Sequence, residues 1–185
     1  ISKVGVLFGD AAGEIEAFAA TAATGLGQSR QQAMDAAATF ATFGKGAGLS
    51  GSALADFSTD LTVLASDMAS FSNTSPAQAI EASGAALRGE SEPIRAYGVL
   101  LDDATLRQKA LELGITSTTK DALTPQQKVL AAQAAIFDQT SAAQGDFART
   151  IEESGPPQWS PAQGAGVSNS SGVPCSRCVL AAMEP

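Results

Sequence analysis

The longest regular alternation of apolar and polar residues lies between Ser50 and Asn73. Its apolar positions are separated by three and four residues, as on one face of an α-helix. They are Leu54, Phe57, Leu61, Leu64, Met68 and Phe71. The pattern predicts a helix about 35 Å long. We expect it to form the centre of the fold with its apolar face buried inside the chain's own bundle. An oligomer seam is the alternative, although the pattern covers few heptads.

Two helices are predicted before this segment. The first runs from Asp10, as N-cap, to Gly25, with its inward face formed by Ile15, Phe18 and Ala22. The second starts at Ser29, because Ser29 and Gln32 have the spacing of a capping box, and ends at Gly44. Its inward positions are Met34, Ala37, Ala38 and Ala41. The following GKGAGLSG, residues 44–51, predicts a loop because it is rich in glycine.

Two further helices begin with the same device of cap, proline and glutamine. Ser75, Pro76 and Gln78 start a helix that ends at Arg88, before Gly89. Its small-residue face consists of Ala79, Ala82, Ser83 and Ala86. Thr124, Pro125 and Gln127 start another, which runs to about Ala143. The residues expected to point inward there are Leu130, Ala134 and Phe137.

Between these two helices the chain reads as a short helix-loop-helix unit. Ser91 is placed to cap a short turn that Pro93 opens, and residues 97–101 predict an extended apolar connector. Asp102 is expected to cap a helix that Gly114 ends. Its inward face would be Leu106, Ala110 and Leu113. Residues 115–121 are rich in threonine and predict a loop.

These elements predict an all-α fold, a compact bundle of five or six short-to-medium helices. We expect the helical domain to cover residues 1–155 and an irregular tail rich in Pro, Gly and Ser to cover residues 156–185. By composition the tail reads as a disordered linker. Our hypothesis is that it is instead translated out of frame, with VLAAMEP, residues 179–185, back in register. Helix-forming sequence in another reading frame of the gene would support this. Because residue 1 is Ile rather than Met and no signal-peptide pattern follows, we expect an internal fragment.

Composition narrows the classes of partner. The chain has 11 Lys and Arg against 19 Asp and Glu, a formal net charge of −8, and its charges are scattered along the sequence. Nucleic-acid binders concentrate basic residues on one face, so we expect no specific nucleic-acid partner. No apolar stretch approaches the roughly 20 residues that a membrane span needs, so no span is expected.

The sequence contains a few residues that could suggest catalysis, phosphate binding or metal binding, but each has a structural explanation or lacks the required partners. The chain contains no histidine, which excludes Ser-His-Asp and Cys-His catalysis and the commonest zinc ligand. The glycines of residues 44–50 lack the order of a phosphate-binding loop. Cys175 and Cys178 have metal or redox spacing but no second ligand pair.

Two acidic pairs are the remaining candidates. Glu90 and Ser91 have the Glu-Ser order of lytic transglycosylases, but the surroundings are a charged turn without sugar-binding aromatics. Asp102 and Asp103 suggest a metal pair, yet a helix start explains both carboxylates. We therefore predict no catalytic, cofactor-binding or metal-binding residue, and no enzyme.

Several long runs resemble a known protein family. They are LASDMASFSNTSPAQAIEASGAALRGE, GESEPIRAYGVLLDDATLRQKALELGI, TPQQKVLAAQAAI and QGDFART. Together they resemble tail tape-measure proteins of long-tailed bacteriophages and prophages. The resemblance is good from about Gly44 to Thr150, looser over the first forty-odd residues, and fails from about Pro156.

The resemblance implies a structural role. Tape-measure proteins act as the scaffold for tail-tube polymerisation, as the ruler that sets tail length, and as a component released ahead of DNA during ejection. It implies the tail-tube protein and tail assembly chaperones as partners, self-association in the tail lumen, and a location in the virion after assembly in the host cytoplasm. The alternatives are a segment that borders a tail-associated peptidoglycan hydrolase and a generic helical interaction module.

Overall fold

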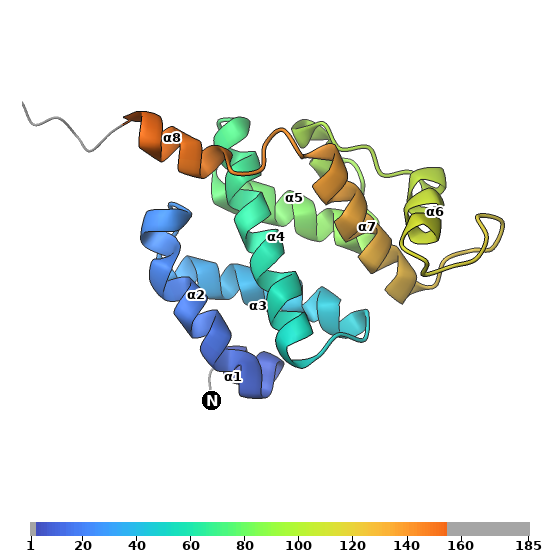
Figure 1. The fold of residues 1–185 in the computed structure, drawn as a ribbon, viewed down its shortest axis with the longest axis horizontal. Coiled ribbons are helices and arrows are strands. Elements are labelled where there is room, and N and C mark those ends of the chain that lie inside the picture. Colours follow the sequence, from blue (N-terminus) through green and yellow to red (C-terminus); the bar gives the residue numbers. More distant parts are fainter. Residues whose placement is uncertain (1–2, 155–185) are drawn as a thin grey trace, which may run out of the picture. The chain divides into compact units, whose positions relative to one another are not determined.

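The structure, a computed structural model, describes residues 3–154, and over this range it is all-α, as the sequence predicts (Figure 1). Its elements are α1 (Lys3–Phe8), the 3₁₀ turn η1 (Gly9–Ala11), α2 (Ala12–Gly25), α3 (Arg30–Gly46), α4 (Gly51–Phe71), α5 (Pro76–Arg88), the 3₁₀ helix η2 (Pro93–Tyr97), α6 (Asp103–Glu112), α7 (Pro125–Gln139) and α8 (Asp146–Ser154). Helices α1 and α8 are additional to those that the sequence analysis expects. The predicted tail and its boundary at residue 156 lie outside the described residues.

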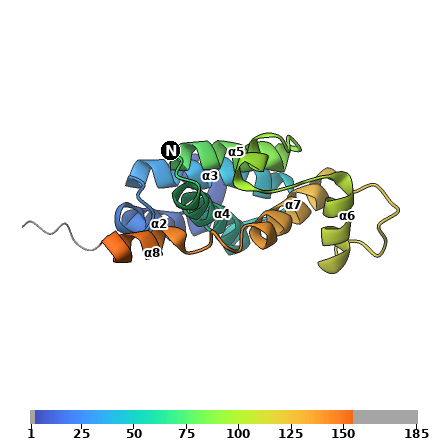
Figure 2. The ribbon, with the colours of Figure 1, turned by 90° about the horizontal axis from the view of Figure 1, so that it is seen from above.

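Helix α4 is the centre of this unit. It contacts α1, α2, α3, α5 and α8, and Figure 2 shows α3 and α5 together on one side of it. The predicted apolar face is buried from Leu54 to Met68, within the chain's own bundle. Phe71 is the exception, since 58% of it is exposed. It is the last residue of α4.

Helix α4 is also buried on a second face, which the alternation of apolar and polar residues does not predict. Ser58, Thr62 and Ser66 lie on this face and are almost fully buried. Each hydroxyl donates to the carbonyl four residues earlier, at 2.7 Å for Ser58, 2.8 Å for Thr62 and 3.2 Å for Ser66. Because each hydroxyl donates within the helix, and Ser66 also accepts from Nε2 of Gln28 at 2.6 Å, neighbouring helices can cover these groups without leaving a buried donor unpaired.

All three predicted capping boxes are present. The pairs are Ser29 with Gln32, Ser75 with Gln78, and Thr124 with Gln127. In each, the hydroxyl accepts the N3 amide while the glutamine oxygen accepts the N-cap amide. The structure also confirms Gly89 as a left-handed C-cap, with φ of 97°. Local side-chain chemistry therefore fixes the start of α3, α5 and α7.

The predicted N-cap at Asp10 is wrong. Asp10 lies inside η1, and the residue before α2 is Ala11, with no side-chain cap. The reason is that α1 runs through η1 directly into α2, so the chain is already helical where the cap was expected. Val4 and Phe8 bury this additional helix against α3 and α4.

The predicted loop over residues 44–51 begins three residues too early. Helix α3 continues to Gly46, and Gly44 is buried against α4. A Cβ atom at Gly44 would lie 2.6 Å from Cδ1 of Leu54 and 3.0 Å from Cδ1 of Phe57. This glycine is required by the close approach of two helices rather than by a turn.

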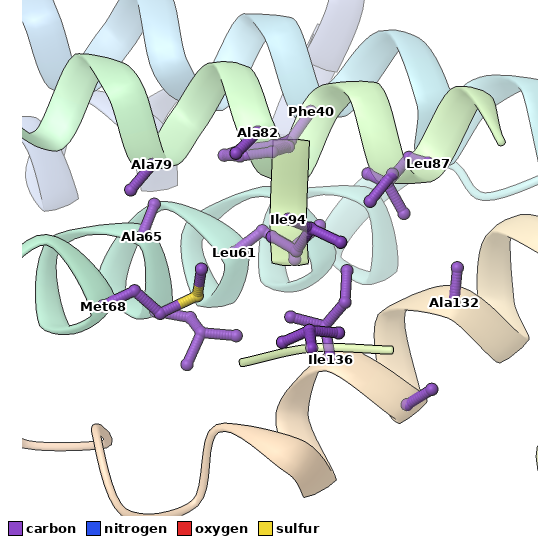
Figure 3. Packing of buried hydrophobic residues seen from close by; sticks show 14 of the residues in the cluster. Phe40, Leu61, Ala65, Met68, Ala79, Ala82, Leu87, Ile94, Ala132 and Ile136 are labelled. Atoms are coloured by element: carbon purple, nitrogen blue, oxygen red, sulfur yellow. The ribbon is translucent and has the colours of Figure 1, made fainter. Parts of the chain in front are cut away.

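The connector between α5 and α6 forms part of the core. Ser91 does not cap the turn, because Glu92 occupies the N-cap position in a helical conformation and makes no side-chain cap bond. Tyr97 ends η2, and the extended segment starts only after Gly98, whose φ is 78°. Ile94 and Val99 are fully buried. Figure 3 shows Ile94 between Leu61 of α4 and Ile136 of α7, so the connector fills the space between these helices.

A side-chain amide holds the connector in place. The backbone N–H of Leu100 donates to Oε1 of Gln139 at 2.8 Å, and Nε2 of Gln139 donates to the carbonyl of Leu100 at 3.0 Å. Gln139, the last residue of α7, thus pairs with both polar groups of one extended residue, as a neighbouring β-strand would. Leu100 itself is exposed, while Val99 and Leu101 are buried.

Helix α6 packs against α7. Asp102 caps it as predicted, since its Oδ1 accepts the N–H of Thr105 at 2.7 Å, and this bond holds the pKa of Asp102 below its ordinary value. Lys109 forms ion pairs with Asp138 of α7 and with Glu112. The hydrogen bond to Asp138, and then that to Glu112, raise the pKa of Lys109.

The inward faces predicted for α6 and α7 need correction. Leu113 is half exposed because α6 ends at Glu112 and Gly114 turns the chain away with φ of 69°. Helix α7 ends at Gln139, not near Ala143. Its buried residues are Ala131, Ala132, Ala135 and Ile136, whereas the predicted Leu130, Ala134 and Phe137 are only half-buried. The small alanines lie where the helices pack most closely, and Leu130 and Phe137 lie at the edge of the contact.

We expect Gly44→Ala to lower the free energy of unfolding by about 1–3 kcal/mol, because the new methyl group overpacks the contact with Leu54 and Phe57. Gly46→Ala is the matched control in the same helix, with no atom within 4 Å of the added Cβ. It should leave stability unchanged or raise it slightly through helix propensity. Urea denaturation of both variants measures the difference. Equal midpoints would contradict the close approach at Gly44.

Candidate functional site

The structure places Glu90 and Ser91 in an exposed turn. Glu90 forms an ion pair with Arg88, with 3.0 Å between Oε1 and Nε, and 61% of its side chain is exposed. A glutamate that acts as a general acid instead sits in apolar surroundings that favour its neutral form. The geometry of Glu90 supports a salt bridge at the end of α5.

Asp102 and Asp103 are both used at the start of α6. Asp102 accepts the capping hydrogen bond, and Asp103 forms an ion pair with Arg107 one turn later. Residues 3–154 contain no group of three or more Cys, Asp or Glu side chains arranged to hold a metal ion. Cys175 and Cys178 lie outside the described residues.

The glycine-rich segment at residues 44–50 does not form a phosphate cradle. Gly44 and Gly46 belong to α3, and the amide hydrogen bonds of Ala47 and Leu49 go back to carbonyls of that helix. The amino group of Lys45 donates to the carbonyl oxygen of Val6 at 3.5 Å, which links the end of α3 to α1.

A groove of about 520 Å³ lies between α3 and α5. Much of its polar lining already has partners within the chain. Gln32 and Ser75 belong to capping boxes, Asp35 accepts from Gln31, and Arg88 pairs with Glu90. Of the remaining polar lining, Oε1 of Gln28 is buried without a hydrogen-bond partner, and Glu81 is exposed.

A second groove, of about 480 Å³, is bordered by α4, α7 and the segment after α6; we call it the α4–α7 groove. Four of its apolar lining residues, Leu113, Leu130, Ala134 and Phe137, were expected to point inward, and the fifth, Ile115, was expected in a loop. Its polar lining is Asp60 and Gln133. Helix α7 thus has one apolar face buried in the core and another that is only partly covered, which is typical of interaction surfaces.

Asp60 places a negative charge at the edge of this apolar groove. It lies one helical turn after Asp56, and within residues 3–154 neither carboxylate takes part in an ion pair. Asp60 is exposed as a residue, but partial burial of its carboxylate, and then the charge of Asp56, raise the pKa of Asp60 above its ordinary value. A cationic group placed here would oppose this shift.

Asp67 is a buried carboxylate that joins α4 to α8. It is 6% exposed, and its two oxygens accept the backbone N–H groups of Gly145, at 2.8 Å, and of Phe147, at 3.3 Å. These amides lie at the positive end of α8, where a negative charge is favourable. Phe147 packs directly on Gly27, whose Cβ would lie 2.7 Å from its ring. One side chain of the central helix therefore fixes a helix almost 80 residues later.

The sequence does not single out Asp60 or Asp67 as functional residues. The Asp56 and Asp60 pair was visible as two like charges four residues apart on a predicted helix, which is unfavourable without a partner. Asp67 gave no such signal, because its partners are backbone amides of a helix that was not predicted. The structure brings together no catalytic constellation among the residues that the sequence singled out.

Within residues 3–154, no helix combines the length and hydrophobicity that crossing a bilayer requires. No protein family, curated protein or solved structure matches this chain.

We expect Asp67→Asn to destabilise α8. Asparagine keeps one acceptor oxygen but turns an NH₂ group toward the other backbone donor, so unfolding should become easier by about 2 kcal/mol. Hydrogen exchange of the α8 amides should also become faster. Asp56→Asn, an exposed carboxylate on the same helix, is the control. If the two variants match in urea midpoint and in α8 exchange, Asp67 does not hold α8.

Proposed function

We propose that this chain is a structural segment of a phage tail tape-measure protein. The observation that carries the proposal is the resemblance of residues 44–150, a stretch that runs through helices α4 to α8. The geometry is compatible with it, because the polar residues that suggested chemistry serve as helix caps and ion pairs. These features support an architectural role rather than a catalytic one.

In this role the segment takes part in tail-tube assembly and in setting tail length. Its partners are the tail-tube protein, the tail assembly chaperones and further copies of itself in the tail lumen. A helical ruler works because its rise is fixed at about 1.5 Å per residue. The packed helices of residues 3–154 are not extended end to end, so we place the length-measuring stretch elsewhere in the parent protein.

The proposal predicts that peptides from residues 3–154 occur in purified tail particles from cells that carry the gene. Mass spectrometry measures this, and their abundance should be far below that of the tail-tube protein. Insertion of about 70 helix-forming residues in the extended part of the parent protein should lengthen tails by about 100 Å in electron micrographs. Absence of the peptides from tails, or unchanged tail length, would contradict the proposal.

A zymogram on peptidoglycan separates the enzyme alternative from this proposal. We expect no clearing by the chain, because Glu90 is exposed and paired with Arg88. Glu90→Gln serves as the control. Clearing that disappears in this variant would show that the chain is a hydrolase.

A further inference from the structure

The α1 end of the unit presents an apolar side chain between two lysines. Val6 is 64% exposed, the largest exposed fraction among the large hydrophobic residues of residues 3–154. Lys3 lies three residues earlier on the same side of α1, and Lys45 of α3 reaches the carbonyl oxygen of Val6. Over the described part of the chain, neither lysine has a carboxylate within ion-pair distance. We call Val6, Lys3 and Lys45 the α1 patch.

The α4–α7 groove has the opposite character. It offers apolar walls from Leu113 and Phe137, and its charged lining residue is Asp60, with Asp56 one turn away. Like the lysines of the α1 patch, these carboxylates make no ion pair in the part of the chain that the structure describes. Both surfaces therefore offer an apolar contact, and their charges are opposite.

We propose that copies of this chain associate head to tail, with the α1 patch of one copy seated in the α4–α7 groove of the next. Val6 would cover the apolar walls, while Lys3 and Lys45 would face Asp60 and Asp56. Such a contact joins two different surfaces. A pair of copies therefore keeps one free α1 patch and one free α4–α7 groove, to which further copies can add. The proposed function includes self-association, and this contact would supply a specific surface for it, but the argument for the contact uses these two surfaces alone.

The small size of the α1 patch sets the strength of the contact. One valine and two exposed ion pairs make a small interface, so the association should be weak and should weaken further at high salt. Because the chain has a net charge of −8, two copies repel each other in most orientations. Association is then favoured only where surfaces of opposite charge meet. Sedimentation velocity over a concentration series, at low salt, is the suitable measurement.

The test uses charge reversal on both surfaces of the full chain. A reducing agent is present to prevent disulfides through Cys175 and Cys178. Asp60→Lys alone should weaken self-association at least about tenfold, because it places like charges opposite the two lysines. The Lys3→Glu and Lys45→Glu double variant should do the same. Circular dichroism confirms that each variant is folded.

Mixing the two variants should restore association, because each supplies the surface that complements the other. Weakening by both variants is what separates this contact from a symmetric one, because a contact of groove on groove, or of patch on patch, would respond to only one of them. Glu81→Lys is the matched control: it makes the same change in net charge at an exposed carboxylate outside the groove, and should not weaken association.

Three results would overturn the proposal. The first is a wild-type chain that stays monomeric at every concentration, in which case something other than a second copy covers the groove. The second is an Asp60→Lys variant that associates as strongly as Glu81→Lys. The third is a mixture of the charge-reversed variants that remains as weakly associated as each variant alone.

Discussion

The fold depends on the internal hydrogen bonding of α4. A helix in the middle of a bundle is covered on more than one side, and its polar side chains must then find partners without water. Ser58, Thr62 and Ser66 do so by donating to carbonyls of α4 itself. Because these side chains are short and already satisfied, neighbouring helices can pack closely over them. The glycine at position 44 serves the same close packing from the side of α3.

The outer elements are attached to this centre by a few specific contacts. Ile94 and Val99 connect the core of α4 and α5 to α7, and Gln139 secures the connector that carries them. Helix α6 packs on α7, while α8 is held by Asp67 and by the contact of Phe147 with Gly27. Helix α6 packs mainly on α7 and helix α8 mainly on α4, whereas α4 is covered by several helices, so α6 and α8 should open more easily than the core.

Sequence alone predicts the features that local chemistry decides. The fold class, the capping boxes at Ser29, Ser75 and Thr124, and the central helix all follow from short-range patterns. Burial is less predictable, because it depends on which neighbours a face meets. Phe71 is the last residue of α4 and Leu113 directly follows the last residue of α6, and both are at least half exposed. On α7 the alanines rather than Leu130 or Phe137 make the close contacts. The α4–α7 groove and the role of Asp67 arise from contacts between distant segments, for which a single sequence holds no local signal.

Native-state hydrogen exchange tests the central position of α4 most directly. If its internal hydrogen bonds and its coverage on several sides organise the fold, amides from Leu61 to Met68 should exchange only through global unfolding. Amides of α6 and α8 should exchange faster, through local opening. Exchange of the α4 amides at the rate of α6, or protection that is highest in α7, would contradict this account.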